Sequence, residues 1–195
     1  MRYILASASP RRKEILASMG LKFEITVADA DESSDTRDPV ALTKELASKK
    51  GRAVKDKLSD EGKYDADTVI ISADTVVVCD GEILGKPKDR ADAERMLRML
   101  SGRTHNVVSG VALTKGNETF TDASVTHVTF DMLDEEFLSR YIDSDEPYDK
   151  AGAYAIQGGA AAVISKIEGC YFGVVGLPIN CLVNLAKKNN IPFEI

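Results

Sequence analysis

Residues 3–20 read YILASASPRRKEILASMG, and this segment sets the beginning of the fold. Its first four residues form a short, largely apolar run that predicts a buried strand. Pro10 suits the first position of a helix, which we expect to continue to about Met19 and to end at Gly20. A strand that turns directly into a helix is typical of an α/β fold.

The same alternation of strands and helices continues along the chain. Residues 72–75 are interpreted as a separator between two strands, while turns at 79–82 and 115–117 join antiparallel neighbours. Because parallel and antiparallel elements are mixed, we predict an α/β fold with a mixed sheet rather than a pure doubly wound one. Further strands are predicted at 23–27, 69–71, 76–78, 107–114, 124–130 and 161–167, and further helices at 39–58, 89–100, 134–143 and 177–188.

Length and composition indicate an ordinary globular chain of 195 residues, expected to form one domain, or one domain with two lobes. The net charge of −6 argues against a protein that binds nucleic-acid duplexes, although a local cluster of cations could hold a small anion. The three cysteines lack CxxC spacing and are expected to be reduced, mostly buried thiols. No apolar run reaches about 18 residues, and arginines follow the short apolar start, so we predict a cytoplasmic protein without a signal peptide or membrane span.

The turn after the first strand, Ser7-Ala8-Ser9-Pro10-Arg11-Arg12, has the features of a phosphate site. Free N–H groups and the helix dipole favour an anion at a helix start. Arg11 and Arg12 add planar guanidinium groups that can bind phosphate oxygens in pairs. From spacing alone, a capped surface helix with two solvated arginines explains the segment equally simply, so the turn needs support from elsewhere in the chain.

Asp74 stands in the otherwise apolar run Ile71-Ser72-Ala73-Asp74-Thr75-Val76. A carboxylate in such a run is unlike a packing residue, and it could bind Mg²⁺ or activate a water molecule. The alternative is a turn aspartate between two strands. Glu32, in an acidic loop that would ordinarily be solvated, could supply a second metal oxygen if that loop faces Asp74.

Three further residues could act on a nucleotide if the fold brings them to the arginines. Lys50 lies on the long predicted helix, and Lys86 lies between Gly85 and Pro87, which fix its backbone. Each lysine alone is more commonly a solvated surface residue. Gln157, in a loop rich in small residues, can donate and accept hydrogen bonds and so suits the edge of a base, although an ordinary connecting loop has the same composition.

Several enzyme classes are excluded, because the chain has no Walker loop, no GxGxxG and no GxSxG motif. His105 and His127 lack metal-ligand spacing and are expected to be structural.

Taken together, six ordered blocks resemble the Maf family of nucleoside triphosphate pyrophosphatases, also known as septum-formation inhibitor proteins. The blocks cover nearly the whole chain and are LASASPRR at 5–12, SADTVV at 72–77, GKP at 85–87, SGRTH at 101–105, EPYDKAGAYAIQG at 146–158 and VVGLP at 174–178. The resemblance implies an inosine-triphosphatase-like (Maf/Ham1) fold, with a twisted mixed sheet in two lobes around a central cleft, and a homodimer. It implies hydrolysis between the α and β phosphates with a divalent cation, Mg²⁺ or Mn²⁺.

The same resemblance assigns roles to the candidate residues. Asp74 takes the position of the proton acceptor, and Glu32 with Asp74 lies near the metal. Whether Asp74 is the base or a metal ligand stays open at this point, because a carboxylate bound to a metal is a poor base. The implied phosphate-handling and substrate-binding residues are Ser9, Arg12, Lys50 and Lys86.

Three positions separate substrate classes within the family, and here they hold Arg11, Thr75 and Gln157. This combination is similar to the branch that acts on dTTP and UTP. The sister branch, which acts on methylated guanosine triphosphate, has a tryptophan after the proline, a DQV block and a glutamate before the last glycine. Two departures from the family pattern, Cys170 and Gly51, do not affect groups expected to do chemistry.

The sequence therefore predicts a metal-dependent dTTP and UTP pyrophosphatase with a house-cleaning or cell-division role, and leaves open whether modified pyrimidine nucleotides are also substrates. The competing hypothesis is a nucleotide-binding regulator of septum formation with little turnover. Its weakness is that binding alone does not require a placed water activator such as Asp74.

Overall fold

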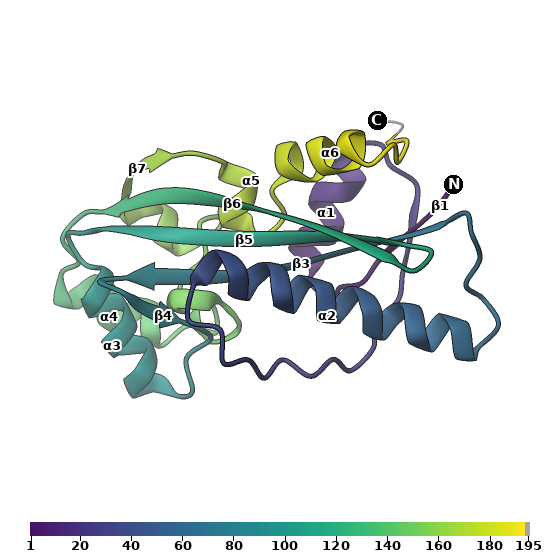
Figure 1. The fold of residues 1–195 in the computed structure, drawn as a ribbon. Coiled ribbons are helices and arrows are strands. Elements are labelled where there is room, and N and C mark those ends of the chain that lie inside the picture. Colours follow the sequence, from purple (N-terminus) through teal and green to yellow (C-terminus); the bar gives the residue numbers. More distant parts are fainter. Residues whose placement is uncertain (194–195) are drawn as a thin grey trace. The chain divides into compact units, whose positions relative to one another are not determined.

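The computed structural model describes residues 1–193 and divides into two compact units (Figure 1). The first unit contains residues 1–74, 109–124 and the described chain from 176 onward. The second contains residues 75–108 and 125–175. Three long strands contribute residues to both units.

Seven strands within residues 1–193 form one sheet in the order β2-β1-β3-β5-β6-β7, with β4 paired to β3. β1 is parallel to both β2 and β3, whereas β4 is antiparallel to β3 and β7 is antiparallel to β6. The predicted α/β fold with a mixed sheet is therefore confirmed. The strands are β1 (Arg2–Leu5), β2 (Phe23–Ile25), β3 (Thr68–Cys79), β4 (Glu82–Leu84), β5 (Thr104–Lys115), β6 (Glu118–Phe130) and β7 (Ile164–Glu168).

The first unit begins as the sequence predicts. α1 (Pro10–Ser18) follows β1, is capped by Ser9, and is terminated by Gly20 at a φ of +78°, a conformation that glycine adopts without steric cost. The unit also contains α2 (Pro39–Asp60) and α6 (Ile179–Lys188). The sixth helix starts two residues later than predicted, because Pro178 occupies its N-cap.

Helix α2 lies very close to the strands that it covers, and Figure 1 shows it running along β3 and β5. A Cβ atom at Gly110 of β5 would meet backbone atoms of Thr43 and Lys44, the Lys44 nitrogen at 2.7 Å. A Cβ atom at Gly51 of α2 would lie 2.8 Å from the Ser72 Oγ. Both glycines therefore allow a close approach of helix and sheet: Gly110 admits the backbone of α2, and Gly51 admits the Ser72 hydroxyl.

The predicted separator at residues 72–75 is wrong, because β3 continues through it. Ser72 and Asp74 are buried, and each finds a partner on α2. The Ser72 Oγ donates to the Ala47 carbonyl at 2.7 Å, and Asp74 accepts from Lys50. Since these polar groups are satisfied from outside the strand, the strand does not have to break to hydrate them.

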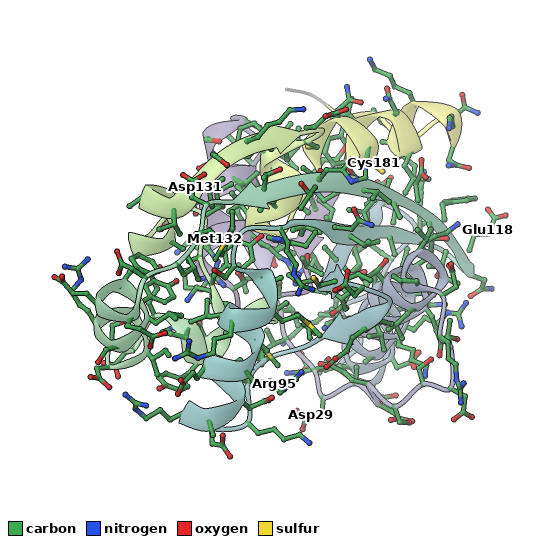
Figure 2. The ribbon with its side chains drawn as sticks, turned by 90° about the vertical axis from the view of Figure 1, so that its left-hand side faces the viewer. Asp29, Arg95, Glu118, Asp131, Met132 and Cys181 are labelled. Carbon is green, nitrogen blue, oxygen red and sulfur yellow. The ribbon has the colours of Figure 1, made fainter. Side chains whose placement is uncertain are left out.

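The second unit contains α3 (Arg90–Leu100), capped by Asp89, and α4 (Glu135–Ile142), capped by Asp134. The Asp-Gly turn between β3 and β4 is confirmed, with positive φ at both Asp80 and Gly81. Figure 1 shows α3 next to α4, joined by ion pairs from Arg98 to Glu135. Arg95, on the outer surface of α3 in Figure 2, bonds Glu82 at 2.7 Å and ties the β4 hairpin to the helix.

The remainder of the second unit is less regular than the sequence suggests. The strand predicted at 161–167 begins only at Ile164, because Gly159–Val163 forms a 3₁₀ turn in which four of the five residues are glycine or alanine, types that are depleted in strands. Two further 3₁₀ turns, Pro147–Asp149 and Ala151–Ala153, and the short helix α5 (Tyr171–Val175) were not predicted.

The cysteines are free thiols, as predicted, but only Cys79 is buried, whereas Cys170 and Cys181 are partly exposed. Within residues 1–193, no helix has both the length and the apolar character needed to cross a membrane.

His105 is structural, as predicted. It lies in the core of the second unit, with its ring edge-on to Phe130 and Tyr154 at centroid distances of 5.1 and 5.3 Å. Its Nε2 atom is hydrogen-bonded to the Tyr154 hydroxyl at 2.8 Å, and within residues 1–193 its Nδ1 atom has no partner. Burial lowers the pKa of His105 from 6.5 to about 4.

We expect Gly110→Ala to destabilise the protein by at least about 2 kcal/mol, because the new methyl group would collide with the backbone of α2, which cannot rotate away. Chemical denaturation measures this loss. Gly85→Ala is the matched control, since a methyl group there meets open space. Equal stability of the two variants would contradict the close approach.

Stability should fall as the pH drops from 6.5 to 4. The pKa of His105 is lower in the folded state, so the unfolded chain binds the proton first as the pH falls. The free energy of unfolding is therefore at its full value above pH 6.5 and decreases towards pH 4. The expected loss is about 3 kcal/mol. Denaturation across this range should give a flatter profile for His105→Gln, whereas a matched change at the exposed His127, His127→Gln, should leave the slope unchanged.

Candidate active site

The turn between β1 and α1 is held by its own hydroxyl groups. The Ser9 side chain caps α1 by accepting from the Arg12 N–H at 3.5 Å, and the Ser9 N–H donates to the Ser7 Oγ at 3.2 Å. The alternative of a capped helix is thus correct for Ser9. Capping and anion binding are compatible, because the dipole of α1 and the two adjacent guanidinium groups still favour a negative charge at the helix start.

Arg12 is fixed by backbone that lies far away in the sequence. Its Nε donates to the Gly176 carbonyl at 2.8 Å, and its Nη1 lies 3.5 Å from the Ser7 Oγ. The side chain is half-buried rather than solvated. Desolvation lowers the pKa of Arg12, and the carboxylates of Asp74 and Glu32 oppose that shift, so the guanidinium stays charged near both acids.

Lys50 gathers the acidic candidates around one ammonium group. Its Nζ donates to Asp74 Oδ1 at 2.5 Å and lies 3.2 Å from Glu32 Oε2. The Asp74 side chain is 11% exposed, so its ion pair with Lys50 is largely buried. The Glu32 side chain is 60% exposed, so its ion pair with Lys50 is solvated. The condition stated for Glu32, that the acidic loop faces Asp74, is therefore met, because both carboxylates contact the Lys50 ammonium.

Close packing of α2 on β3 produces this pair. Gly51, directly after Lys50, admits the Ser72 hydroxyl where a side chain would stand. Ser72 precedes Asp74 by two residues in β3, so their side chains share one face of the sheet. The face that bonds Ser72 to α2 is therefore the face that presents Asp74 to Lys50.

The acidic pair has donors suited to a divalent cation. Within residues 1–193, no group of three or more His, Cys, Asp or Glu side chains is arranged to hold a metal. Mg²⁺, however, commonly binds through one or two carboxylates together with waters and substrate phosphates. Asp74 and Glu32, both facing one ammonium, supply that number of hard oxygen ligands.

The other predicted substrate residues are distributed over both units. Arg11, in the first, is half-buried beside Arg12 and lowers the pKa of its neighbour. Thr75 belongs to the second unit and directly follows Asp74 in β3. Lys86 and Gln157 are exposed residues of the second unit. A joint role of these residues with Asp74 remains a prediction.

Sequence reasoning missed Gly176, whose carbonyl holds Arg12. The residue adopts a φ of +123°, where side chains other than hydrogen are strained. The only signal was the block VVGLP at 174–178, in which a glycine near a proline indicates a special backbone but not its partner.

We expect Lys50→Met to lower the free energy of unfolding by about 1–3 kcal/mol, because it leaves the buried Asp74 carboxylate without its ammonium. The neighbouring Lys49 pairs with Glu45 at the surface, so Lys49→Met should cost no more than about 0.5 kcal/mol. Urea denaturation of both variants compares the two ion pairs. The assignment of a tight pair is wrong if the two variants lose the same stability.

The chain is similar in sequence to known proteins of about the same length. A protein of Symbiobacterium thermophilum named dTTP/UTP pyrophosphatase is 46% identical over 97% of this chain and 95% of its own. Proteins of the same name from Geotalea uraniireducens and Alkaliphilus oremlandii are 46% and 47% identical, over 95% and 90% of this chain and 93% and 90% of their own.

A solved structure of the Staphylococcus aureus Ham1 protein is 16% identical, with a TM-score of 0.48 over 67% of this chain and 72% of that one, a likeness too partial to support an argument. The family model described as Maf-like protein, in contrast, matches residues 2–189. With a match across almost its full length and relatives above 40% identity, the chain belongs to the Maf-like protein family.

Proposed function

We propose that this protein hydrolyses dTTP and UTP to the nucleoside monophosphate and pyrophosphate. The observation that carries the proposal is the ammonium of Lys50 between Asp74 and Glu32, with the guanidinium of Arg12 close to both acids. The shared name of the relatives, dTTP/UTP pyrophosphatase, supports the same activity.

The triphosphate is held at the start of α1. The dipole of α1 and the guanidinium groups of Arg11 and Arg12 offset its charge. Arg12 suits phosphate binding because Gly176 and Ser7 fix the orientation of its guanidinium group before the substrate binds. Little side-chain conformational entropy is therefore lost on binding. Lys50 and Lys86 stabilise the charge that develops on the departing pyrophosphate.

Asp74 activates the attacking water. The water oxygen bonds to the α-phosphorus while the bond from that phosphorus to the bridging oxygen breaks, so the nucleotide leaves as a monophosphate and the pyrophosphate takes the negative charge. Asp74 accepts the water's proton itself; in the alternative, Asp74 and Glu32 would hold Mg²⁺ or Mn²⁺, which would supply the acidification of the water. A bound cation would supply Lewis-acid chemistry at the phosphates, and Lys50 would then be free to contact them.

Thr75, Gln157 and Arg11 determine the choice of base. A binding site that hydrogen-bonds the edge of a pyrimidine disfavours a base that leaves the polar groups of that site unpaired.

The family match extends from residue 2 to 189 and so includes both compact units, which supports one catalytic domain made from them. The proposal includes a homodimer, as the family resemblance implies, and light scattering in solution tests it.

The proposal predicts pyrophosphate release from dTTP and UTP but not from dGTP or ATP. A panel of these nucleotides, each with Mg²⁺ or Mn²⁺ and with chelator, measures both base choice and cation dependence. Release independent of the base would contradict the assigned specificity. Tight nucleotide binding without any release would instead favour the regulator of septum formation.

Asp74→Asn should lower kcat by about 10²–10⁴-fold, because the amide can neither accept the water's proton nor bind a cation strongly. The fold should persist, since the amide oxygen can still accept from Lys50. Asp56→Asn, an exposed change on α2, is the control and should retain activity. Full turnover by Asp74→Asn would remove Asp74 from the mechanism.

A further inference from the structure

The loop between α4 and β7 is closed by a carboxylate that faces inward. Glu146 Oε1 accepts from the Tyr141 hydroxyl at 2.6 Å, and its Oε2 accepts from the Gly159 N–H at 3.0 Å. One side chain therefore joins the end of α4 to the far end of the loop. Hydrogen bonds to an ionised acceptor are about twice as strong as neutral ones, so this link is a firm one.

The Tyr141 hydroxyl makes a second link to the same loop. It accepts from the Ala155 N–H at 3.1 Å while it donates to Glu146. Tyr141 is 5% exposed and its ring stacks on Phe137 at 5.3 Å. Burial and the adjacent Glu146 carboxylate raise the pKa of Tyr141, so the hydroxyl keeps its proton and remains a donor.

The two links lie on either side of Gln157. The Gly158 N–H donates to the Ala155 carbonyl at 3.1 Å and closes a tight turn in which Ile156 is buried and Gln157 is exposed. Tyr141 holds the residue that begins this turn, and Glu146 holds the residue just after it, Gly159.

Gly158 shows how closely the carboxylate packs against the turn. A Cβ atom at this position would overlap all three atoms of the Glu146 carboxyl group. The turn therefore rests directly on the carboxylate, and a side chain at Gly158 would force them apart.

We propose that Tyr141 and Glu146 are positioning residues for Gln157, and that they set the base discrimination of the enzyme without contacting the nucleotide. The proposal rests on the proposed function, in which Gln157 reads the pyrimidine. A turn fixed before binding costs less conformational entropy when Gln157 engages the base, and it prevents the amide from adapting to a purine.

The test compares Tyr141→Phe and Glu146→Ala with the matched controls Tyr148→Phe and Glu136→Ala. The change at Tyr148 likewise removes one hydroxyl bond to backbone, but its acceptor, the Ile142 carbonyl, lies outside the turn. We expect the ratio of kcat/KM for dTTP over dGTP to fall about tenfold in the two test variants, mainly through KM for dTTP. The controls should keep the wild-type ratio.

A double-mutant cycle with Gln157→Ala separates positioning from general destabilisation. If Tyr141 and Glu146 act through Gln157, Glu146→Ala should lower the ratio no further in a Gln157→Ala background. Glu146→Gln should retain part of the discrimination, because its amide oxygen can still accept from one of the two donors. Additive losses, or unchanged ratios in the Tyr141 and Glu146 variants, would overturn the proposal.

Amide hydrogen exchange gives a readout that does not depend on activity. Exchange at residues 155–159 should be faster in Tyr141→Phe than in Tyr148→Phe, and equal rates would refute the links. Failure of the proposed function has a different signature, the absence of pyrophosphate release by the wild-type protein. In that case binding of the α,β-imido analogues of dTTP and dGTP replaces kinetics, with the same ratios expected.

Discussion

The ion pair between Lys50 and Asp74 is the interaction on which the rest of the site depends. Asp74, whose side chain is only 11% exposed, needs a charged partner, and Lys50 supplies one from a different element, α2. The pair can form only because helix and sheet approach closely at Gly51 and Gly110, where side chains would hold them apart. Packing of two elements thus creates a charged site that neither contains alone.

The positive and negative side chains of the candidate site in the first unit largely offset one another. Arg12 and Lys50 are partly neutralised by Asp74 and Glu32, which lie close to them. In the proposed function, a triphosphate would therefore meet a site whose charges largely offset one another. A divalent cation held by the two acids would restore the attraction.

Much of the architecture could be predicted because local signals were strong. Proline at the first helical turn, aspartate caps and the Asp-Gly turn act within a few residues, and α1, α3, α4 and the β3–β4 turn appear where these signals place them. Prediction was wrong where a distant partner decided the outcome. Ser72 and Asp74 look like turn residues until α2 provides their hydrogen-bond partners.

The sequence by itself determined the alternation of elements, the helix start behind Ser9 and the residue types available for phosphate chemistry, because these depend on neighbours in the chain. Only the tertiary structure decided which groups meet: Lys50 with Asp74 and Glu32, Arg12 with the Gly176 carbonyl, and Tyr141 with Glu146. The first two contacts join residues at least 18 positions apart. Their partners are brought together by tertiary packing, and the neighbours of a residue in the chain do not identify its distant partner.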